Sequence, residues 1–359
     1  MKRRNHWHKS LMHLCMYEFK KICFVATCFL VINPPCKAQL PSSDPDYKLV
    51  FGDEFDRTYP PDPVDTKKWA RTGDSNQQGN LTQSVSWCFP EEKSEIRWDR
   101  AYTIKDAKDT TTVAVSNGTC KIRTNKTPYQ GQISNWPQCD PKNPGYAING
   151  EKCKSECKIH GTDKVEKCWT TKMLPFKYTT GMLFSRQKFR YGYFEIRFKL
   201  PPVPQAPYTH EGFGPNFWLY GNKRPENYTS EIDIFEIIAL NPGRNDSNRY
   251  TSTVHYSDKD VPLHPTAHTE EIGNRLKNDT AWHTAAAWWT EDFIKFYFDG
   301  ALYYTVQERK DIPVDKLVEM NLIIDVNSPT SGRCNNFNEK YTQFPYVYEI
   351  DYVRVYQKK

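Results

Sequence analysis

Apolar and aromatic residues alternate with polar ones in short runs along most of the chain, and Gly, Pro, Asn and Asp separate these runs. This two-residue period is typical of β-strands that bury one face. It predicts strands at Tyr47–Phe51, Thr112–Val115, Gly181–Ser185, Tyr193–Leu200, Asn216–Tyr220, Glu231–Ile238, Ser252–Tyr256, Thr284–Trp289, Phe293–Phe298, Leu302–Gln307, Asn321–Asp325 and Glu349–Tyr356. Asp299-Gly300 predicts a hairpin turn, and only Val314–Met320 has helical spacing. Many short strands with few helices predict an all-β jelly-roll sandwich.

The N-terminal segment has a different pattern, in which two lysines precede the apolar run Ile22–Ile32. The run is too short to span a bilayer as a helix, so we expect no transmembrane segment. The order of charged, apolar and small residues is that of a secretory signal. We therefore expect residues 1–38 to be a signal peptide cleaved after Ala38, and residues 39–359 to form one exported domain. Translation from Met16 would shorten the charged region, and a buried N-terminal helix is the alternative.

Composition and charge narrow the possible functions. Hydrophobic residues make up 38% and charged residues 26% of the chain, as in an ordinary globular protein. The net charge is +6, but residues 1–38 hold seven Lys or Arg and one acid, which leaves 42 basic and 42 acidic residues in the remainder. A neutral domain lacks the concentrated positive field that nucleic-acid binding requires. The aromatic content of 14% suits either a binding cleft or simply a large β core.

Seven cysteines follow residue 38, at Cys88, Cys120, Cys139, Cys153, Cys157, Cys168 and Cys334. In an exported protein they predict disulfides, with at least one thiol left free or paired to another chain. Cys153 and Cys157 have loose metal-ligand spacing, but no second pair lies at zinc-finger distance. Residues 120–178 hold five of these cysteines and 11 Lys or Arg against 5 acids. We expect a disulfide-stapled basic insertion, either a solvated loop or a basic wall beside a cleft.

One predicted strand carries three acids within six residues, Glu231, Asp233 and Glu236, among Ile and Phe. Unpaired carboxylates are costly in such a buried segment. Strict alternation places Glu231 and Asp233 on one face and Glu236 on the other. One β-bulge between Asp233 and Glu236 brings all three to the same face, and bulges are frequent beside active sites.

Carboxylates grouped in this way suit glycoside hydrolysis. A retaining glycosidase needs two carboxyls roughly 5–5.5 Å apart, one as nucleophile and one as acid/base. Asp233, between the two glutamates, would hydrogen-bond the nucleophile and raise the pKa of its neighbours as a like charge. An exposed acidic edge or a calcium site is the alternative.

The motif Glu231–Glu236 resembles the E-x-D-x-x-E signature of glycoside hydrolase family 16 in its bulged-strand form. Further blocks are similar to the family in order and spacing. They are Leu49–Asp56, Val64–Trp69, Tyr191–Pro201, Gly212–Tyr220, Trp282–Gly300 and Asp351–Tyr356. The resemblance implies a bent, concanavalin A-like jelly roll whose concave face forms the substrate cleft. It implies Glu231 as nucleophile, Asp233 as helper acid and Glu236 as general acid/base.

The resemblance also implies residues around the acids. Trp218 would stack on a sugar ring, His255 would hydrogen-bond a sugar, and Trp289 matches a tryptophan near the cleft, with core or structural roles as the alternative for each. Many family members bind a structural calcium, and Gly118 (by its carbonyl) and Asp351 sit at matching positions. The chemistry itself would need no cofactor. The expected partner is a polysaccharide substrate, and we expect the protein to be a monomer.

Two departures bear on the substrate. Family members that cut β-1,3-glucan usually read Trp-Pro-Ala-Phe-Trp where this chain has Gly214-Pro-Asn-Phe-Trp218, and a Gly-Gly pair where it has Leu322–Ser328. Phe217–Asp233 is more similar to members that cut algal galactans, and a basic insertion suits sulfate esters. The sequence therefore favours an endo-acting enzyme on a galactan, with β-1,3-glucanase as the alternative. A glycan-binding module without activity and a transglycosylase are further alternatives.

Overall fold

Clustering of contacts divides the chain into Met1–Gln39 and Leu40–Lys359, and every residue described below belongs to the second unit. The computed structural model describes residues 40–56, 64–65, 67–70, 83–85, 101–102, 112–126, 129–134, 156–158, 165–167, 169–176, 179–201, 214–223, 228–239, 248–257, 264–270, 276, 279–308, 312–327 and 343–359. Within these residues no helix is both long and apolar enough to cross a membrane.

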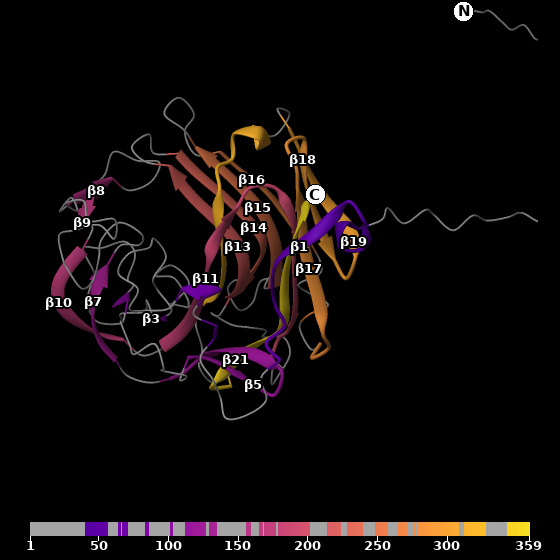
Figure 1. Ribbon diagram of the computed structural model, residues 1–359. Coiled ribbons are helices and arrows are strands. Elements are labelled where there is room, and N and C mark those ends of the chain that lie inside the picture. Colours follow the sequence, from indigo (N-terminus) through magenta and orange to yellow (C-terminus); the bar gives the residue numbers. More distant parts are fainter. Residues whose placement is uncertain are drawn as a thin grey trace, which may run out of the picture. The chain divides into compact units, whose positions relative to one another are not determined.

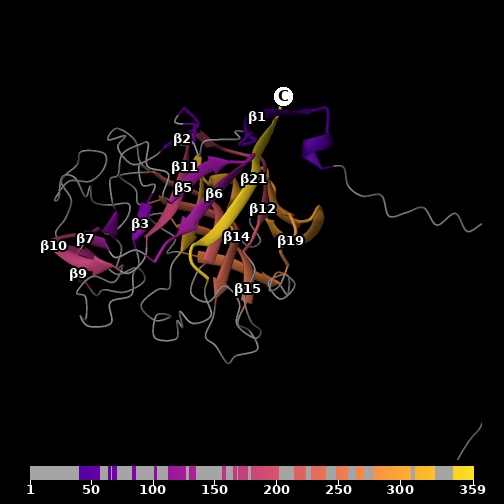
Figure 2. The ribbon, with the colours of Figure 1, turned by 90° about the horizontal axis from the view of Figure 1, so that it is seen from below.

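The smaller of two antiparallel sheets has the order β19-β18-β17-β12-β21-β6-β5, and β1 also pairs with β21. Figure 2 shows β21 between β6 and β12. The strands are β1 (Tyr47–Asp53), β5 (Val113–Ser116), β6 (Thr119–Thr124), β12 (Gly192–Lys199), β17 (His283–Trp289), β18 (Phe293–Phe298), β19 (Ala301–Gln307) and β21 (Tyr346–Lys358).

The larger sheet has the order β10-β7-β4-β3-β11-β20-β13-β14-β15-β16, and β2 also pairs with β11. Its strands β13 to β16 lie side by side in Figure 1. The strands are β2 (Trp69–Ala70), β3 (Gln83–Val85), β4 (Ala101–Tyr102), β7 (Tyr129–Ser134), β10 (Trp169–Phe176), β11 (Thr179–Phe189), β13 (Gly214–Lys223), β14 (Tyr228–Ala239), β15 (Asn248–Ser257), β16 (His264–Glu270) and β20 (Met320–Asn327). A separate ribbon pairs β8 (Glu156–Lys158) with β9 (Val165–Lys167).

The core lies between the two sheets and is built from alternate strand positions. On β12, Phe194, Ile196 and Phe198 are fully buried while the residues between them are partly exposed. Phe198 of the smaller sheet stacks on Phe235 of the larger sheet, with ring centroids 4.7 Å apart. Burying each such side chain contributes about 1.5–3 kcal/mol, so the alternation seen in the sequence stabilises the sandwich directly.

Close packing between the two sheets explains why position 181 is a glycine. A Cβ on Gly181 of β11 would lie 2.3 Å from Cγ2 of Val113 and 2.8 Å from the backbone oxygen of Thr112. Only a residue without a side chain allows β11 to approach β5 this closely.

All the strands predicted from the alternation are present, within a few residues of their expected ends. The Asp299-Gly300 turn joins β18 to β19, and both residues have positive φ (48° and 75°), as a two-residue hairpin turn of this kind requires. The fold class, a jelly-roll sandwich of two antiparallel sheets, is confirmed.

The predicted helix at Val314–Met320 is wrong. Only Val314–Lys316 forms a single 3-10 turn, and the chain is extended from Leu317 onward. Val314, Leu317 and Met320 are all buried, so their three-residue spacing reflects three separate anchors in the core rather than one helical face.

The start of the predicted basic insertion is part of the sandwich, because β6 pairs with β21 and Cys120 is buried there. Of Cys157 the structure describes only its place in β8. The other cysteines expected to form disulfides lie outside the described residues, at Cys88, Cys139, Cys153, Cys168 and Cys334. The disulfides therefore stay a prediction.

Candidate active site

The strand with three acids, β14, contains the predicted bulge. On the neighbouring β15, Thr253 lies opposite Asp233 and Thr251 opposite Glu236, so two residues of β14 oppose a single residue of β15. The register with β13 shifts at the same place. The two residues inside the bulge, Ile234 and Phe235, are both fully buried in the core. The bulge thus removes the one-residue offset that would otherwise send Glu236 into the core.

The three acids share the face of the larger sheet that points away from the core, and we name it the acidic face. Ile323 and Phe184, on β20 and β11, form a small apolar cluster on this face, and Trp218 and Tyr220 of β13 pack against it. The register places one residue of β13 beside each acid: Tyr220 beside Glu231, Trp218 beside Asp233 and Asn216 beside Glu236. Directly opposed residues on one sheet face are contact neighbours.

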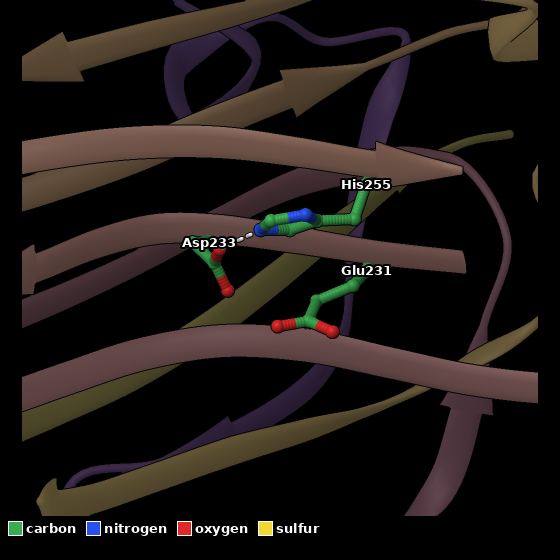
Figure 3. Close-up of side chains that lie close together, drawn as sticks. All are labelled: Glu231, Asp233 and His255. Atoms are coloured by element: carbon green, nitrogen blue, oxygen red, sulfur yellow. Dashed lines mark hydrogen bonds and ion pairs between the residues drawn. The ribbon is translucent and has the colours of Figure 1, made fainter. Parts of the chain in front are cut away.

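His255 completes the group around the first two acids. It lies opposite Glu231 on β15, and its Nε2 is 3.2 Å from Oδ2 of Asp233. Figure 3 shows the three side chains of Glu231, Asp233 and His255 converging on one point. His255, predicted as a sugar ligand, contacts a carboxyl of the site.

The electrostatics of the acids follow from their burial. Burial raises the pKa of Glu231, and the negative charge of Asp233 raises it further, while the charge of His255 acts in the opposite direction. Burial likewise raises the pKa of Asp233, and the charge of Glu236 adds to the effect. The site therefore holds a proton at a pH where isolated carboxyls are ionised.

Glu231, Asp233 and His255 offer ligand atoms within 4.8 Å of one another, a spacing that also suits a small cation.

Sequence analysis missed one residue of the acidic face, Asp325 on β20. Its Oδ1 accepts hydrogen bonds from Nδ2 of Asn216 at 3.0 Å and from Nε1 of Trp218 at 3.2 Å. The feature of the sequence that could have pointed to Asp325 is its position as a single acid within the apolar run Leu322–Val326. Trp218 itself lies where predicted, partly exposed beside Asp233.

Trp289 is a core residue, and the prediction that it binds substrate is wrong. It lies on β17 of the smaller sheet, is 0% exposed, and packs against Phe194 and Tyr191. A ring enclosed in this way is inaccessible to a sugar. The alternative role in core packing holds.

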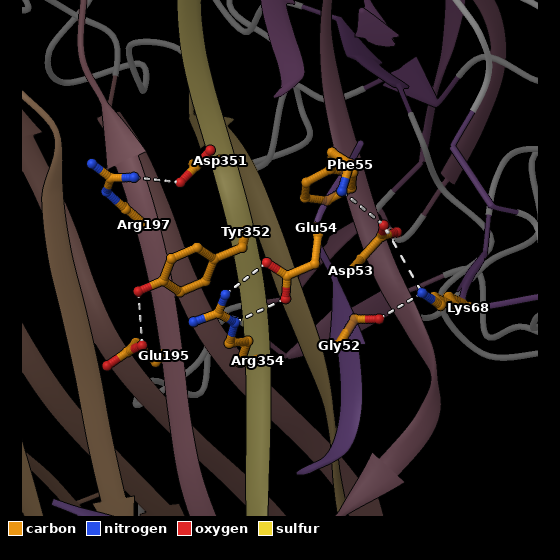
Figure 4. A network of polar contacts seen from close by, with 10 residues as sticks. All are labelled: Gly52, Asp53, Glu54, Phe55, Lys68, Glu195, Arg197, Asp351, Tyr352 and Arg354. Atoms are coloured by element: carbon orange, nitrogen blue, oxygen red, sulfur yellow. Dashed lines mark hydrogen bonds and ion pairs between the residues drawn. The ribbon is translucent and has the colours of Figure 1, made fainter. Parts of the chain in front are cut away.

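Gly118 and Asp351, expected to bind calcium, belong to the smaller sheet. Gly118 forms the turn between β5 and β6 with φ of 74°. Asp351 accepts a hydrogen bond from Nη1 of Arg197 at 2.7 Å, and Figure 4 shows this pair on neighbouring strands. Calcium takes about six to eight oxygen ligands, whereas the Asp351 carboxylate already has a cationic partner. The calcium site therefore stays a prediction.

A jelly-roll sandwich with a bulged acidic strand on one sheet face defines the class of β-sandwich glycoside hydrolases. The family model described as "Beta-porphyranase A-D, GH16 domain" matches residues 147–358, more than half of the chain. The chain therefore belongs to glycoside hydrolase family 16.

Curated relatives are more distant. The chain is 29% identical over 199 residues to the kappa-carrageenase of Pseudoalteromonas carrageenovora, covering 51% of this chain and 48% of the relative. It is 28% identical over 191 residues to the endo-1,3-1,4-beta-glycanase ExsH of Rhizobium meliloti, covering 50% of this chain and 34% of that protein. The matches thus span less than half the length of these relatives.

Solved structures show the same fold. The catalytic domain of an endo-1,3-beta-glucanase (laminarinase) from Thermotoga petrophila superposes with a TM-score of 0.51 at 21% identity, covering 87% of this chain and 98% of the other. LamAcat from Zobellia galactanivorans gives the same TM-score and identity, with coverage of 86% and 98%.

Proposed function

We propose that this chain is an endo-acting, retaining glycoside hydrolase that cleaves internal β-glycosidic bonds of a polysaccharide. The observation that carries the proposal is the bulge in β14, because it brings Glu231, Asp233 and Glu236 to one face of the sheet. Raised pKa values at Glu231 and Asp233 support it, since perturbed carboxyls gather at catalytic sites. Family membership supports the same reaction class.

The proposed mechanism is a double displacement. Glu236 donates its proton to the glycosidic oxygen as that bond to the anomeric carbon breaks, and a carboxylate oxygen of Glu231 forms a covalent bond to the same carbon. The shortened chain then leaves. Glu236, now ionised, takes a proton from water, whose oxygen attacks the anomeric carbon and releases Glu231. Two carboxyls and water supply every group in this balance, so the chemistry requires no cofactor.

Asp233 and His255 hold the nucleophile in this scheme. Burial and the charge of Asp233 raise the pKa of Glu231, and Oδ2 of Asp233 lies 3.2 Å from Nε2 of His255. A protonated Glu231 must lose its proton before it can attack. The Asp233–His255 pair offers the neighbouring acceptor.

For the substrate we propose an algal galactan, with sulfate groups as an option. The family model that matches is that of β-porphyranases, and kappa-carrageenase is among the relatives. The excess of Lys and Arg in residues 120–178 supports an anionic chain. A β-1,3-glucan is the second candidate, because a glucan endo-1,3-beta-glucosidase of Niallia circulans is 27% identical over 207 residues.

The test is a reducing-end assay of the full chain, expressed with its apolar segment Ile22–Ile32 and collected from the exported fraction. The panel holds porphyran, agarose, kappa-carrageenan and laminarin, with Glu231→Gln as the inactive control. Activity on one galactan that Glu231→Gln abolishes supports the proposal, and activity on laminarin alone replaces the substrate. Binding of a glycan without cleavage would instead favour the binding-module alternative, and products longer than the substrate would favour the transglycosylase alternative.

Recovery in the exported fraction tests the proposed localisation, and light scattering tests the expected monomer.

A further inference from the structure

A buried carboxylate lies beneath the residues that flank the acids. Asp325 is 2% exposed, although it stands in the middle of an apolar strand whose neighbours Ile324 and Val326 face the core. An ionised side chain buried in this way is costly unless hydrogen bonds satisfy it. The cost indicates that Asp325 does something an apolar residue would not do.

Asp325 binds two side chains that both stand beside the acids. One oxygen, Oδ1, accepts Nδ2 of Asn216 at 3.0 Å and Nε1 of Trp218 at 3.2 Å. In the register of β13 with β14, Asn216 lies opposite Glu236 and Trp218 opposite Asp233. One buried oxygen therefore links the two β13 residues that are nearest to these two acids.

The contact to Trp218 controls the plane of its ring. The indole is partly exposed on the acidic face, where a sugar would approach. The χ2 torsion of a tryptophan has a broad, roughly two-fold preference, so a hydrogen bond at Nε1 adds a directional restraint to the packing of this ring against Ile323 and Phe184. A hydrogen bond from Nε1 to a fixed charged acceptor selects one plane, and bonds of this kind are stronger than neutral ones.

We infer that Asp325 is a positioning residue, which holds the Trp218 ring and the Asn216 amide in register with the acids so that a sugar ring seats between them. The inference rests on the proposed glycosidase function. Asp325 stays beneath the surface and acts through the side chains of Asn216 and Trp218.

The chain offers a matched control. Asp53 accepts the indole Nε1 of Trp69 at 2.8 Å, but Trp69 is 0% exposed in the core. Asp53→Asn therefore perturbs the same kind of carboxylate–indole bond away from the acidic face. We expect it to lower the thermal unfolding temperature and to leave kcat and KM unchanged.

The kinetic test compares Asp325→Ala in two backgrounds. In the otherwise unchanged chain we expect kcat/KM to fall about ten-fold or more, because a charged hydrogen bond is lost at two donors. In a background with Asn216→Ala and Trp218→Phe neither donor remains, and Asp325→Ala should change kcat/KM less than about two-fold. An effect of equal size in both backgrounds, or no effect in the first, would overturn the inference. Asp325→Asn keeps the shape and one acceptor oxygen, and it replaces Asp325→Ala if that variant fails to fold.

A second arm needs no activity. In a ¹⁵N-indole spectrum of the full chain, the Trp218 signal is the one that Trp218→Phe removes. We expect Asp325→Asn to shift this signal and to speed its exchange with water, while Asp53→Asn leaves it in place. An unmoved Trp218 signal would overturn the inference by itself. If the chain cleaves no polysaccharide, the proposed function fails; the spectrum then tells separately whether Asp325 holds the Trp218 ring.

Discussion

Replacing Glu231 by Gln should abolish turnover and stabilise the fold at the same time. Burial and the charge of Asp233 raise the pKa of Glu231 above its ordinary value. In the unfolded chain the carboxyl returns to that ordinary value, so the folded state binds more protons between the two pKa values. The contribution of this group to stability is therefore complete below the unfolded pKa, and it is lost as the pH rises through the folded one.

The size of the effect follows from the surroundings of the carboxyl. Each unit by which burial raises the pKa costs about 1.4 kcal/mol once the group ionises. Because Glu231 is partly buried beside a like charge, we expect Glu231→Gln to stabilise the fold by about 1–3 kcal/mol at pH 8. At about 2–4 °C per kcal/mol for a domain of this size, the unfolding temperature should rise by several degrees. At pH 4, just below the unfolded pKa, the carboxyl is mostly protonated in both states, so the two proteins should differ much less in stability.

Calorimetry of both proteins at pH 4 and pH 8 measures this difference, and the reducing-end assay measures turnover. Loss of the nucleophile should lower kcat by about 10⁴-fold or more. Glu54→Gln is the control, since Glu54 makes a two-pronged ion pair with Arg354 at 2.7 and 2.8 Å and should gain nothing at pH 8. A Glu231→Gln protein that is no more stable at pH 8, or that gains equally at pH 4, would refute the electrostatic argument. Retained turnover would refute the catalytic role.

Three further predictions follow from the same structure. Asp233→Asn removes a charge that raises the pKa of Glu231, so the acidic limb of the pH profile of kcat/KM should move to lower pH, and the rate should fall. An acidic limb at unchanged pH would show that Asp233 does not control the pKa of Glu231. Glu236→Ala should lose most activity and regain part of it with azide, which replaces the base-activated water and gives a glycosyl azide of retained configuration by NMR. Trp289→Ala should destabilise the core by about 3–5 kcal/mol in denaturant unfolding while KM stays unchanged, because Trp289 is 0% exposed.

The sandwich and the bulge could be predicted because each depends on a local rule. Alternation locates a strand wherever one face is buried, and β12 and β14 follow this rule. The bulge follows from charge: without it, Glu236 would point into a core lined by Ile234 and Phe235. A register shift of one residue keeps all three carboxyls out of the core.

The errors have physical causes of their own. Val314, Leu317 and Met320 repeat every three residues, and an extended chain with a single 3-10 turn buries them as well as a helix would. Trp289 is adjacent in sequence to partly exposed Trp288, and only the pairing of β17 with β12 decides which ring faces the core. Asp325 escaped notice because its partners lie on another strand, about a hundred residues away along the chain.

Catalysis and substrate selection at this site depend on different strands. In the proposed mechanism the acids of β14 act on the glycosidic bond, which every polysaccharide substrate shares, so they define the reaction without selecting the sugar. Selection must come from residues beside them, and on the described part of the acidic face these are contributed by β13, β15 and β20. Asp325 belongs to the stretch Leu322–Ser328, where the resemblance gives glucan-cleaving members of the family a Gly-Gly pair, and it accepts hydrogen bonds from Trp218 and Asn216. If these hydrogen bonds fix the Trp218 ring, they restrict how a sugar can lie beside the acids, so the choice between galactan and glucan should be sought in the Asp325 contacts before the catalytic strand itself.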